Sequence, residues 1–449
     1  MRKQSPFRLF PVLLILFALV VSIIMVRSDS ALGQSAQHSL TRPAGSNPIQ
    51  HIVFILKENR TFDSYFGLFP GVNGATTGNV NVNGRVKTIP LNPLPDSITN
   101  YCHEWSCAHA SNDHGQMDHF NYSPGCNKAP YPCYTEANAN FIPNYWELAR
   151  HFVLNDNTFS SLEGASYANH LYTVAGASGP DQQHSAITNP ALKSGSKSND
   201  SWGCDAPQGT TTKLLNGQRV YPCFSYGTMA DELEAYHVPW KFYAPQHTEP
   251  GYIWNTLDGF SSIRNSNLWS QRVFPWQNIT ADAQSNNLPA VSWVTAPTPY
   301  SEHPPESSCS GENWTANIIN AIEKSPAWSS TAIFLAWDDY GGFYDHVNPP
   351  TIDGLGYGFR VPFMVISPYA YATTNAQSNA HVDHTQLEFS SVLRFAEQVF
   401  NLPSLHRRDS TAGDLMKDFD FSQVHEQPII LQQRSCTGKI LPLSGSFND

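Results

Sequence analysis

Two adjacent aspartates at the end of an apolar segment could bind a metal ion. Residues 332–337 (AIFLAW) carry no charge, which is typical of a strand buried on both faces of a sheet, and Asp338 and Asp339 follow directly. Ligands of α/β proteins bind at the carboxyl ends of strands, where paired carboxylates suit a divalent cation. Gly341 and Gly342 would let the backbone turn sharply beside it. A solvated Asp-Asp turn is the alternative interpretation.

A second apolar segment ends in the same way. Residues 52–56 (IVFIL) are followed, after one lysine, by Glu58 and Asn59. Two buried strands that both end in ligand-type side chains are better evidence for a site than either strand alone. We therefore predict that Glu58 and Asn59 share a metal site with Asp338 and Asp339, the alternative being an ordinary turn with a helix cap.

Ser166 could serve as a nucleophile or as a helix cap. It follows Gly164 by two residues and precedes a predicted helix over 167–175. A helix N-terminus offers backbone N–H groups and a positive dipole end to an anion, so a serine that attacks phosphate would suit this position. Taken alone, the local sequence favours the cap.

The histidine-rich stretch 101–121 is harder to interpret. Its histidines could be metal ligands, phosphate contacts or pH-sensitive loop residues, but they lack the tight spacing of motifs such as H-E-x-x-H. We expect at least half of them to be surface residues. The four are His103, His109, His114 and His119.

Strands and helices alternate along the chain, which predicts a largely parallel sheet with helices on both faces. Segment 71–100 is predicted to be a loop, and 361–367 the last clear central strand. No P-loop or dinucleotide-binding motif is present in the sequence. Strands are expected at 52–56, 152–154, 240–243, 290–294, 332–337 and 361–367, and helices at 142–151, 167–175, 226–236, 314–322 and 386–400.

The first residues are typical of an export signal. A positive start is followed by a long apolar run, so residues 1–33 are predicted to be a signal peptide or an uncleaved N-terminal anchor, residues 34–48 a linker and residues 49–449 a single domain. A net charge of −11 gives no reason to expect a nucleic acid partner. No stable protein partner is implied. We expect a secreted or extracytoplasmic protein.

Eight cysteines on an exported chain indicate disulfides. A zinc–thiolate site is disfavoured because no two cysteines have C-x2-C spacing. The simplest pairing joins neighbours in the sequence and leaves the last two for each other: Cys102–Cys107, Cys126–Cys133, Cys204–Cys223 and Cys309–Cys436.

Together, the motifs resemble a known family. They are 58–63 (ENRTFD), 65–67 (YFG), 115–118 (GQMD), 164–169 (GASYAN), 302–304 (EHP), 337–339 (WDD), 342–347 (GFYDHV) and 358–362 (GFRVP). In this order they resemble the bacterial phosphoesterase family that holds phospholipases C and an acid phosphatase, within the alkaline-phosphatase-like superfamily. The resemblance covers residues 51–409 and implies an α/β fold, a three-layer α/β/α sandwich with a mostly parallel central sheet and loop-rich, disulfide-stapled insertions.

The resemblance also implies roles for matched positions. One divalent metal ion, of unknown identity, would be held by Glu58, Asn59, Asp338 and Asp339. The remaining matched positions are Ser166 as nucleophile, His303 and His103 as site histidines, and Asn169 and His384 as substrate-binding residues. The sequence departs from the family where Ala165 and His170 stand at positions that often hold proline and arginine, which leaves the headgroup preference open.

These implications define the expected function. The chain resembles an exported, metal-dependent hydrolase of phosphoric esters, phospholipase C-like, that acts through a serine nucleophile and a phosphoserine intermediate. A general acid phosphatase is the alternative within enzymes. A sulfatase is disfavoured because no C-x-P-x-R sequence is present. A non-catalytic exported binding protein is the alternative outside enzymes.

Overall fold

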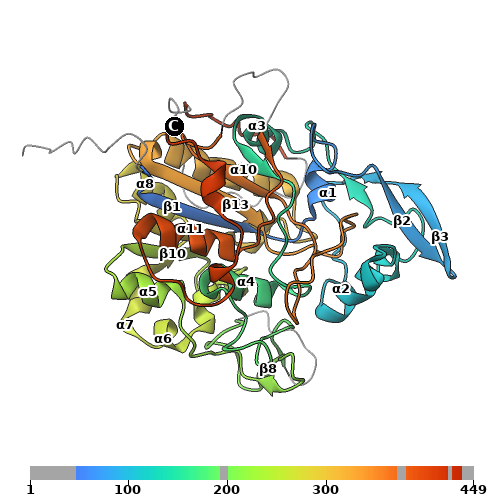
Figure 1. Cartoon of the computed structure of the whole chain (residues 1–449), viewed down its shortest axis with the longest axis horizontal. Helices are drawn as coiled ribbons and strands as arrows, with labels where there is room; N and C mark the ends of the chain where they lie inside the picture. The colour runs from blue at the N-terminus through green and yellow to red at the C-terminus, as the bar shows by residue number, and fades with distance from the viewer. Residues whose placement is uncertain (1–46, 193–200, 372–380, 423–426, 437–449) are drawn as a thin grey trace, which may run out of the picture. The chain divides into compact units, whose positions relative to one another are not determined.

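An eight-stranded sheet forms the centre of the protein (Figure 1). The computed structural model describes residues 47–192, 201–371, 381–422 and 427–436. The strand order is β11-β10-β12-β1-β13-β14-β6-β15, and every strand except β14 runs in the same direction. The strands are β1 (His51–Lys57), β6 (Val153–Asn155), β10 (Trp240–Ala244), β11 (Val273–Pro275), β12 (Val291–Thr295), β13 (Thr331–Trp337), β14 (Phe363–Ile366) and β15 (His381–Asp383).

The two apolar segments of the sequence are the two middle strands. All seven residues of β13 are buried, and only His51 of β1 is partly exposed. β1 and β13 pair in parallel over their full lengths, so their carboxyl ends lie side by side at one edge of the sheet. Continuous burial on both faces is what helix layers above and below a sheet impose.

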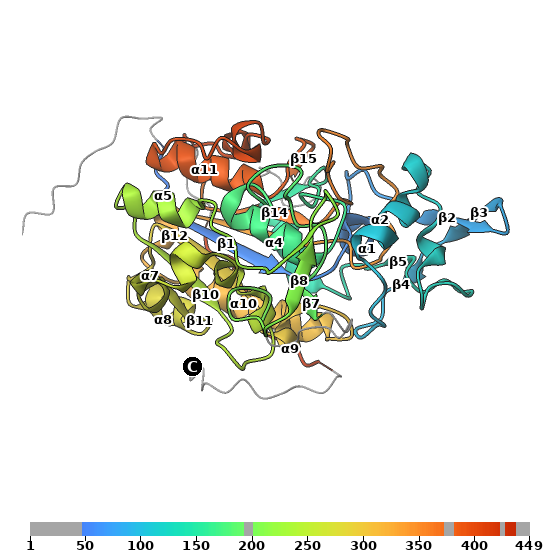
Figure 2. The ribbon, with the colours of Figure 1, turned by 90° about the horizontal axis from the view of Figure 1, so that it is seen from below.

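Helices cover both faces of this sheet (Figure 2). One layer holds α4 (Ser166–Ala175), α5 (Met229–Ala235) and α11 (Ser390–Phe400), and the other holds α3 (Pro143–His151), α8 (Asn278–Gln284) and α10 (Ser308–Glu323). The predicted three-layer α/β/α arrangement with a mostly parallel sheet is therefore confirmed. The shorter elements are α1 (Phe62–Phe66), α2 (Trp105–Asn112), α6 (Ser261–Arg264), α7 (Asn267–Arg272), α9 (Thr298–Ser301), β4 (Asn92–Pro93), β5 (Thr135–Glu136), β7 (Ala191–Leu192), β8 (Thr210–Lys213) and β9 (Arg219–Val220).

The prediction of a loop over 71–100 was wrong. The expected loop 71–100 contains the antiparallel hairpin β2 (Thr77–Val82) and β3 (Arg85–Pro90). Its turn is Asn83-Gly84, with φ of 55° and 75°, which is a strong hairpin signal between alternating strands. β14 lies between β13 and β6, so the prediction that 361–367 is the last central strand is confirmed, and β15 adds an edge strand beside β6.

All four predicted disulfides are present, as Cys102–Cys107, Cys126–Cys133, Cys204–Cys223 and Cys309–Cys436. The last one ties the C-terminal segment to the start of α10. Four disulfides indicate an oxidising compartment. The predicted signal or anchor (1–33) and the linker up to residue 46 lie outside the described residues. Across 47–192, 201–371, 381–422 and 427–436, no helix has the length and apolarity that a membrane span requires.

Candidate active site

The predicted metal ligands meet at the carboxyl ends of β1 and β13. Lys57 pairs with Trp337 in the sheet register, so Glu58 and Asp338 are the next residues on neighbouring strands. The backbone N–H of Asp338 donates to the Lys57 carbonyl oxygen at 2.9 Å, which continues the ladder into the turn. The sequence prediction that these side chains come together agrees with this geometry.

The turn after Asp339 needs glycine. Gly341 has a φ of 60°, and a Cβ added there would lie 2.6 Å from the Cβ of Asn59. Asn59 itself has a φ of 58°. The two turns therefore pass each other too closely for any side chain at Gly341, and this close approach keeps Asn59 next to the aspartates.

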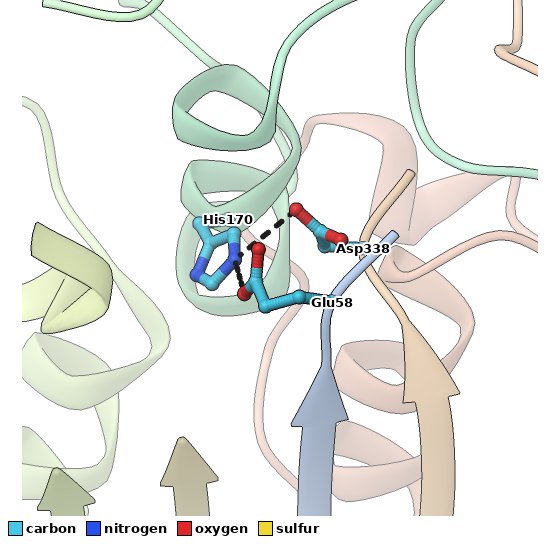
Figure 3. Close-up of side chains that lie close together, drawn as sticks. All are labelled: Glu58, His170 and Asp338. Carbon is cyan, nitrogen blue, oxygen red and sulfur yellow. Dashed lines mark hydrogen bonds and ion pairs between the residues drawn. The ribbon is translucent and has the colours of Figure 1, made fainter. Parts of the chain in front are cut away.

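Glu58 and Asp338 face each other inside the protein (Figure 3). The two side chains are at most 3 % exposed. Burial and the facing Asp338 carboxylate raise the pKa of Glu58 well above its ordinary value. Burial raises the pKa of Asp338, but the His170 imidazole, the Asn59 N–H and the Glu58 side chain together outweigh burial and lower it to about 2. One oxygen of each carboxylate lies within 4.8 Å of the other. Two buried carboxylates so close together cannot both carry charge without a nearby cation.

Ser166 points at Asp339. Its Oγ donates to Asp339 Oδ2 at 2.9 Å, and the Gly341 N–H donates to Asp339 Oδ1 at 2.7 Å. Burial and the neighbouring Asp338 carboxylate raise the pKa of Asp339 well above its ordinary value. The cap interpretation of Ser166 was wrong: the N-cap residue of α4 is Ala165, so the serine begins the helix and its hydroxyl faces the strand ends.

The Asn59 amide links the aspartates to His303. The side-chain amide of Asn59 has two polar atoms, N and O, which a flip exchanges. One of them lies 3.1 Å from Asp338 Oδ1 and 3.2 Å from Asp339 Oδ1, and the other lies 3.1 Å from His303 Nε2. With the amide N–H groups turned toward the aspartates, the amide oxygen accepts from His303 Nε2, and all of these groups are satisfied. His303 Nδ1 donates to the Pro304 carbonyl oxygen at 2.8 Å, so this orientation has a proton on both ring nitrogens.

The two predicted site histidines lie together. The ring centroids of His103 and His303 are 5.9 Å apart, and His103 Nδ1 donates to the Tyr101 carbonyl oxygen at 2.8 Å. Both rings line a cavity of about 320 Å³, and the Trp254 and His303 ring centroids are 5.8 Å apart. The cavity is also lined by Glu104, Asn189, Trp202, Ile253 and Thr298.

The two predicted substrate-binding residues, Asn169 and His384, make hydrogen bonds to the protein itself. The Asn169 amide donates to the carbonyl oxygens of Leu162 (3.3 Å) and Gly164 (3.2 Å), and its oxygen accepts from the Leu162 N–H at 3.0 Å. These bonds shape the turn before Ser166. His384 has an exposed side chain whose Nδ1 bonds Asp156 at 2.7 Å, after a strand three positions from β13 in the sheet. The structure does not bring His384 together with the other predicted residues.

His170 is the site residue that sequence reasoning missed. It follows Ser166 by four positions on α4, so the two side chains share a helix face. Its Nε2 lies 2.9 Å from Glu58 Oε1 and 3.5 Å from Asp338 Oδ2 (Figure 3). The i, i+4 spacing of a serine and a histidine on one predicted helix was the available signal.

The residues present fit a divalent cation. Glu58 Oε2 and Asp338 Oδ2 are buried and accept a hydrogen bond from no residue that the structure describes. Glu58, His170 and Asp338 each direct a ligand atom into one small volume. Buried carboxylate oxygens without donors are costly, and a bound cation would compensate for that cost.

Comparison with known families decides which proteins this site belongs with. The Phosphoesterase family matches residues 49–403, about four-fifths of the chain, and this range includes every proposed site residue. The chain belongs to the Phosphoesterase family. The resemblance drawn from the motifs is thereby confirmed at the level of the family.

Curated relatives of this phosphoesterase are phospholipases C. It is 28 % identical over 473 residues to a non-hemolytic phospholipase C of Pseudomonas aeruginosa, covering 89 % of this chain and 62 % of that protein. It is 28 % identical over 447 residues to phospholipase C B of Mycobacterium tuberculosis, covering 85 % and 79 %. The chain thus spans less than two thirds of the Pseudomonas relative.

Solved structures that resemble this phosphoesterase are distant. A member of the alkaline phosphatase superfamily from Vibrio parahaemolyticus is 10 % identical, covers 81 % of this chain and 70 % of its own, and aligns with a TM-score of 0.36.

Proposed function

We propose that this protein is a metal-dependent hydrolase of phosphoric diesters, of the phospholipase C type, with Ser166 as its nucleophile. The observation that carries the proposal is the position of the Ser166 hydroxyl. It lies at the N-terminus of α4, 2.9 Å from Asp339 and beside the buried carboxylates that fit a cation. The phospholipase C relatives agree with this chemistry.

Asp339 is placed to take the serine proton. The Ser166 Oγ–H already points at its Oδ2, so the proton and a carboxylate acceptor are within hydrogen-bond reach. The freed Oγ attacks phosphorus and forms a P–O bond, while the ester bond to the leaving alcohol breaks. The positive end of the α4 dipole stabilises the charge on the phosphoryl oxygens.

Glu58, Asn59, Asp338 and Asp339 would hold the divalent ion. Bound there, the ion would lower the pKa of a hydroxyl and withdraw charge from a phosphoryl oxygen. The orphaned oxygens of Glu58 and Asp338 support this assignment.

His303 and His103 would supply the proton that the leaving oxygen needs. In both rings Nδ1 is fixed by a backbone carbonyl oxygen, Pro304 for His303 and Tyr101 for His103. Fixing Nδ1 orients the ring and leaves Nε2 to exchange a proton. Water then attacks the phosphorylated serine, with the histidine as the base, and restores Ser166.

The cavity beside these histidines, of about 320 Å³, has room for an organic substituent of the ester. Trp202 and Trp254 line the cavity with aromatic rings, and Glu104 adds a carboxylate. Aromatic faces beside a carboxylate suit an organic cation such as a quaternary ammonium headgroup.

Hydrolysis of two chromogenic substrates tests this function. We expect wild type to cleave para-nitrophenyl phosphorylcholine faster than para-nitrophenyl phosphate, and to lose both activities with a chelator. Ser166→Ala should lower kcat by roughly 10⁴-fold or more, the usual loss when a nucleophile is removed. Ser285→Ala, at the exposed end of α8, is the matched control and should behave as wild type.

The other outcomes are equally informative. Faster cleavage of the monoester would indicate a general phosphatase. Near-normal turnover by Ser166→Ala would refute the nucleophile assignment. If neither ester is cleaved in a Ser166-dependent, metal-dependent manner, the phospholipase C proposal fails and the non-catalytic alternative gains weight.

A further inference from the structure

His170 occupies an unusual place in the site. Its imidazole is buried, and Nε2 faces two carboxylates that come from different strands (Figure 3). α4 carries it one helical turn beyond Ser166. Glu58 follows β1 and Asp338 follows β13. The three side chains therefore belong to three separate elements that converge on one point, which local helix or turn structure does not require.

The distances around His170 match those between ligands of one ion. Its Nε2 is 2.9 Å from Glu58 Oε1 and 3.5 Å from Asp338 Oδ2. Nitrogen and oxygen ligands lie about 2.1 Å from a transition metal, so neighbouring ligands are separated by roughly 3.0 Å in an octahedron and 3.4 Å in a tetrahedron. A shared ion would require little rearrangement of these three atoms.

The surroundings of the other ring nitrogen agree with a ligand role. His170 Nδ1 lies 3.5 Å from Thr256 Oγ1, and Thr256 Oγ1 donates to the Trp254 carbonyl oxygen at 3.4 Å. A hydroxyl that donates elsewhere presents a lone pair to Nδ1, so Nδ1–H has an acceptor when Nε2 coordinates an ion. Thr256 would then hold the ring from outside.

We propose that His170 Nε2 is a ligand of the ion in this site. The proposal rests on the metal-dependent function proposed above and specifies its metal. Four oxygen-bearing side chains alone suit Mg²⁺ or Ca²⁺, whereas an added imidazole selects a first-row transition ion such as Zn²⁺. All eight cysteines are paired in disulfides, so no thiolate competes for such an ion.

Titration calorimetry with Zn²⁺ and Mg²⁺ on the metal-stripped protein tests this assignment. Wild type should bind Zn²⁺ far more tightly than Mg²⁺. His170→Gln should weaken Zn²⁺ binding by at least about 10-fold while leaving the weak Mg²⁺ binding nearly unchanged. His346→Gln is the matched control, because His346 also lies against a buried carboxylate, Asp63, yet should leave Zn²⁺ affinity unchanged.

A second measurement does not depend on the variant folding. Wild type labelled with ¹⁵N-histidine and loaded with ¹¹³Cd should show a one-bond ¹¹³Cd–¹⁵N splitting on an Nε2 resonance. Thr256→Val should shift that resonance, because Thr256 contacts the same ring.

The outcomes separate the two proposals. If wild type binds no divalent ion, the proposed metal-dependent function fails. If wild type binds Zn²⁺, but folded His170→Gln binds it equally well or no splitting is seen, the ligand assignment is overturned. His170 would then be a positioning residue that donates to Glu58, and the proposed function would stand.

Discussion

Two buried acidic clusters in this protein use the same residue types for different purposes. The site cluster is Glu58, Asp338 and His170, and the second cluster is Asp63, Asp345 and His346. Each takes one carboxylate from 58–63 (ENRTFD) and one from 338–346 (DDYGGFYDH). All four carboxylates are buried. Composition and burial alone therefore do not distinguish a reaction site from a structural network.

The second cluster is closed by an internal cation. Arg360 donates to Asp63 Oδ1 at 3.0 Å and to both oxygens of Asp345 at 3.0 and 3.2 Å. His346 donates from its backbone N–H and its ring to Asp63 Oδ2, and backbone N–H groups complete the remaining positions. Each carboxylate oxygen accepts at least one hydrogen bond, so this network stabilises the loops and needs no ion.

Among the described residues, no arginine bridges the carboxylates of the site cluster, and their basic partner is His170, 2.9 Å from Glu58 Oε1 and 3.5 Å from Asp338 Oδ2. Glu58 Oε2 and Asp338 Oδ2 accept no hydrogen bond there. Unsatisfied buried acceptors are destabilising, and proteins tolerate them mainly where a ligand or ion satisfies them. The comparison shows that the partners of each carboxylate oxygen, not the residue types, identify the cluster that binds something.

The largest expected effect on stability comes from replacing one aspartate of each cluster by asparagine. Asp345→Asn should lower the free energy of unfolding by about 3–5 kcal/mol, because it leaves Arg360 partly unpaired and turns an amide N–H toward donors. Asp338→Asn should leave stability in chelator unchanged or higher, because its amide can donate to the orphaned Glu58 oxygen. Urea unfolding of the two variants in the presence of a chelator measures both changes in unfolding free energy.

The effects on catalytic activity should be the reverse of those on stability, with the larger loss in Asp338→Asn. Asp338→Asn should lose tight metal binding and lower kcat/KM by roughly 10³-fold, since a bound ion supplies several kcal/mol of charge stabilisation. Asp345→Asn should retain metal affinity at temperatures where it is folded. Equal destabilisation by the two variants would mean that the clusters do not differ as described.

A smaller effect is expected in the pH dependence of stability. Burial and Asp338 raise the pKa of Glu58, so the folded protein keeps a proton that the unfolded chain releases above its ordinary pKa of 4.5. Stability in chelator should therefore fall as pH rises above that value. Glu58→Gln should reduce the fall and raise the unfolding free energy at neutral pH by on the order of 1–3 kcal/mol. Urea unfolding at several pH values tests this prediction. Equal slopes of the unfolding free energy against pH for wild type and Glu58→Gln would contradict it.

The smallest effect concerns the histidine of the second cluster. Burial lowers the pKa of His346, but the Asp63 carboxylate outweighs burial and raises it above its ordinary value of 6.5. The charged ring stabilises the fold below pH 6.5, and this contribution is lost as pH rises through the raised pKa. His346→Gln should cost about 0.5–1 kcal/mol below that pH and less at pH about 8.5. A cost that grows with pH in thermal unfolding would contradict the assignment.

Local sequence by itself determined the central strands and the edge of the sheet at which the site lies. Uncharged apolar runs over 52–56 and 332–337 predicted the two central strands, because only a strand covered on both faces tolerates such runs. Polar residues directly after each run predicted where a site would form, since parallel strands end at the same edge of the sheet. The simplest pairing of the cysteines, between neighbours in the chain, agrees with the four disulfides.

Tertiary structure alone decided the contacts that define the site. The hydroxyl of Ser166 faces Asp339 instead of capping α4, because packing of the helix against the strand ends sets its rotation. His170 joins Glu58 and Asp338 for the same reason. Arg360, almost 300 residues after Asp63 in the chain, satisfies one acidic cluster and leaves the other open. Such pairings depend on the distances between elements, which side-chain type and spacing within one segment do not encode.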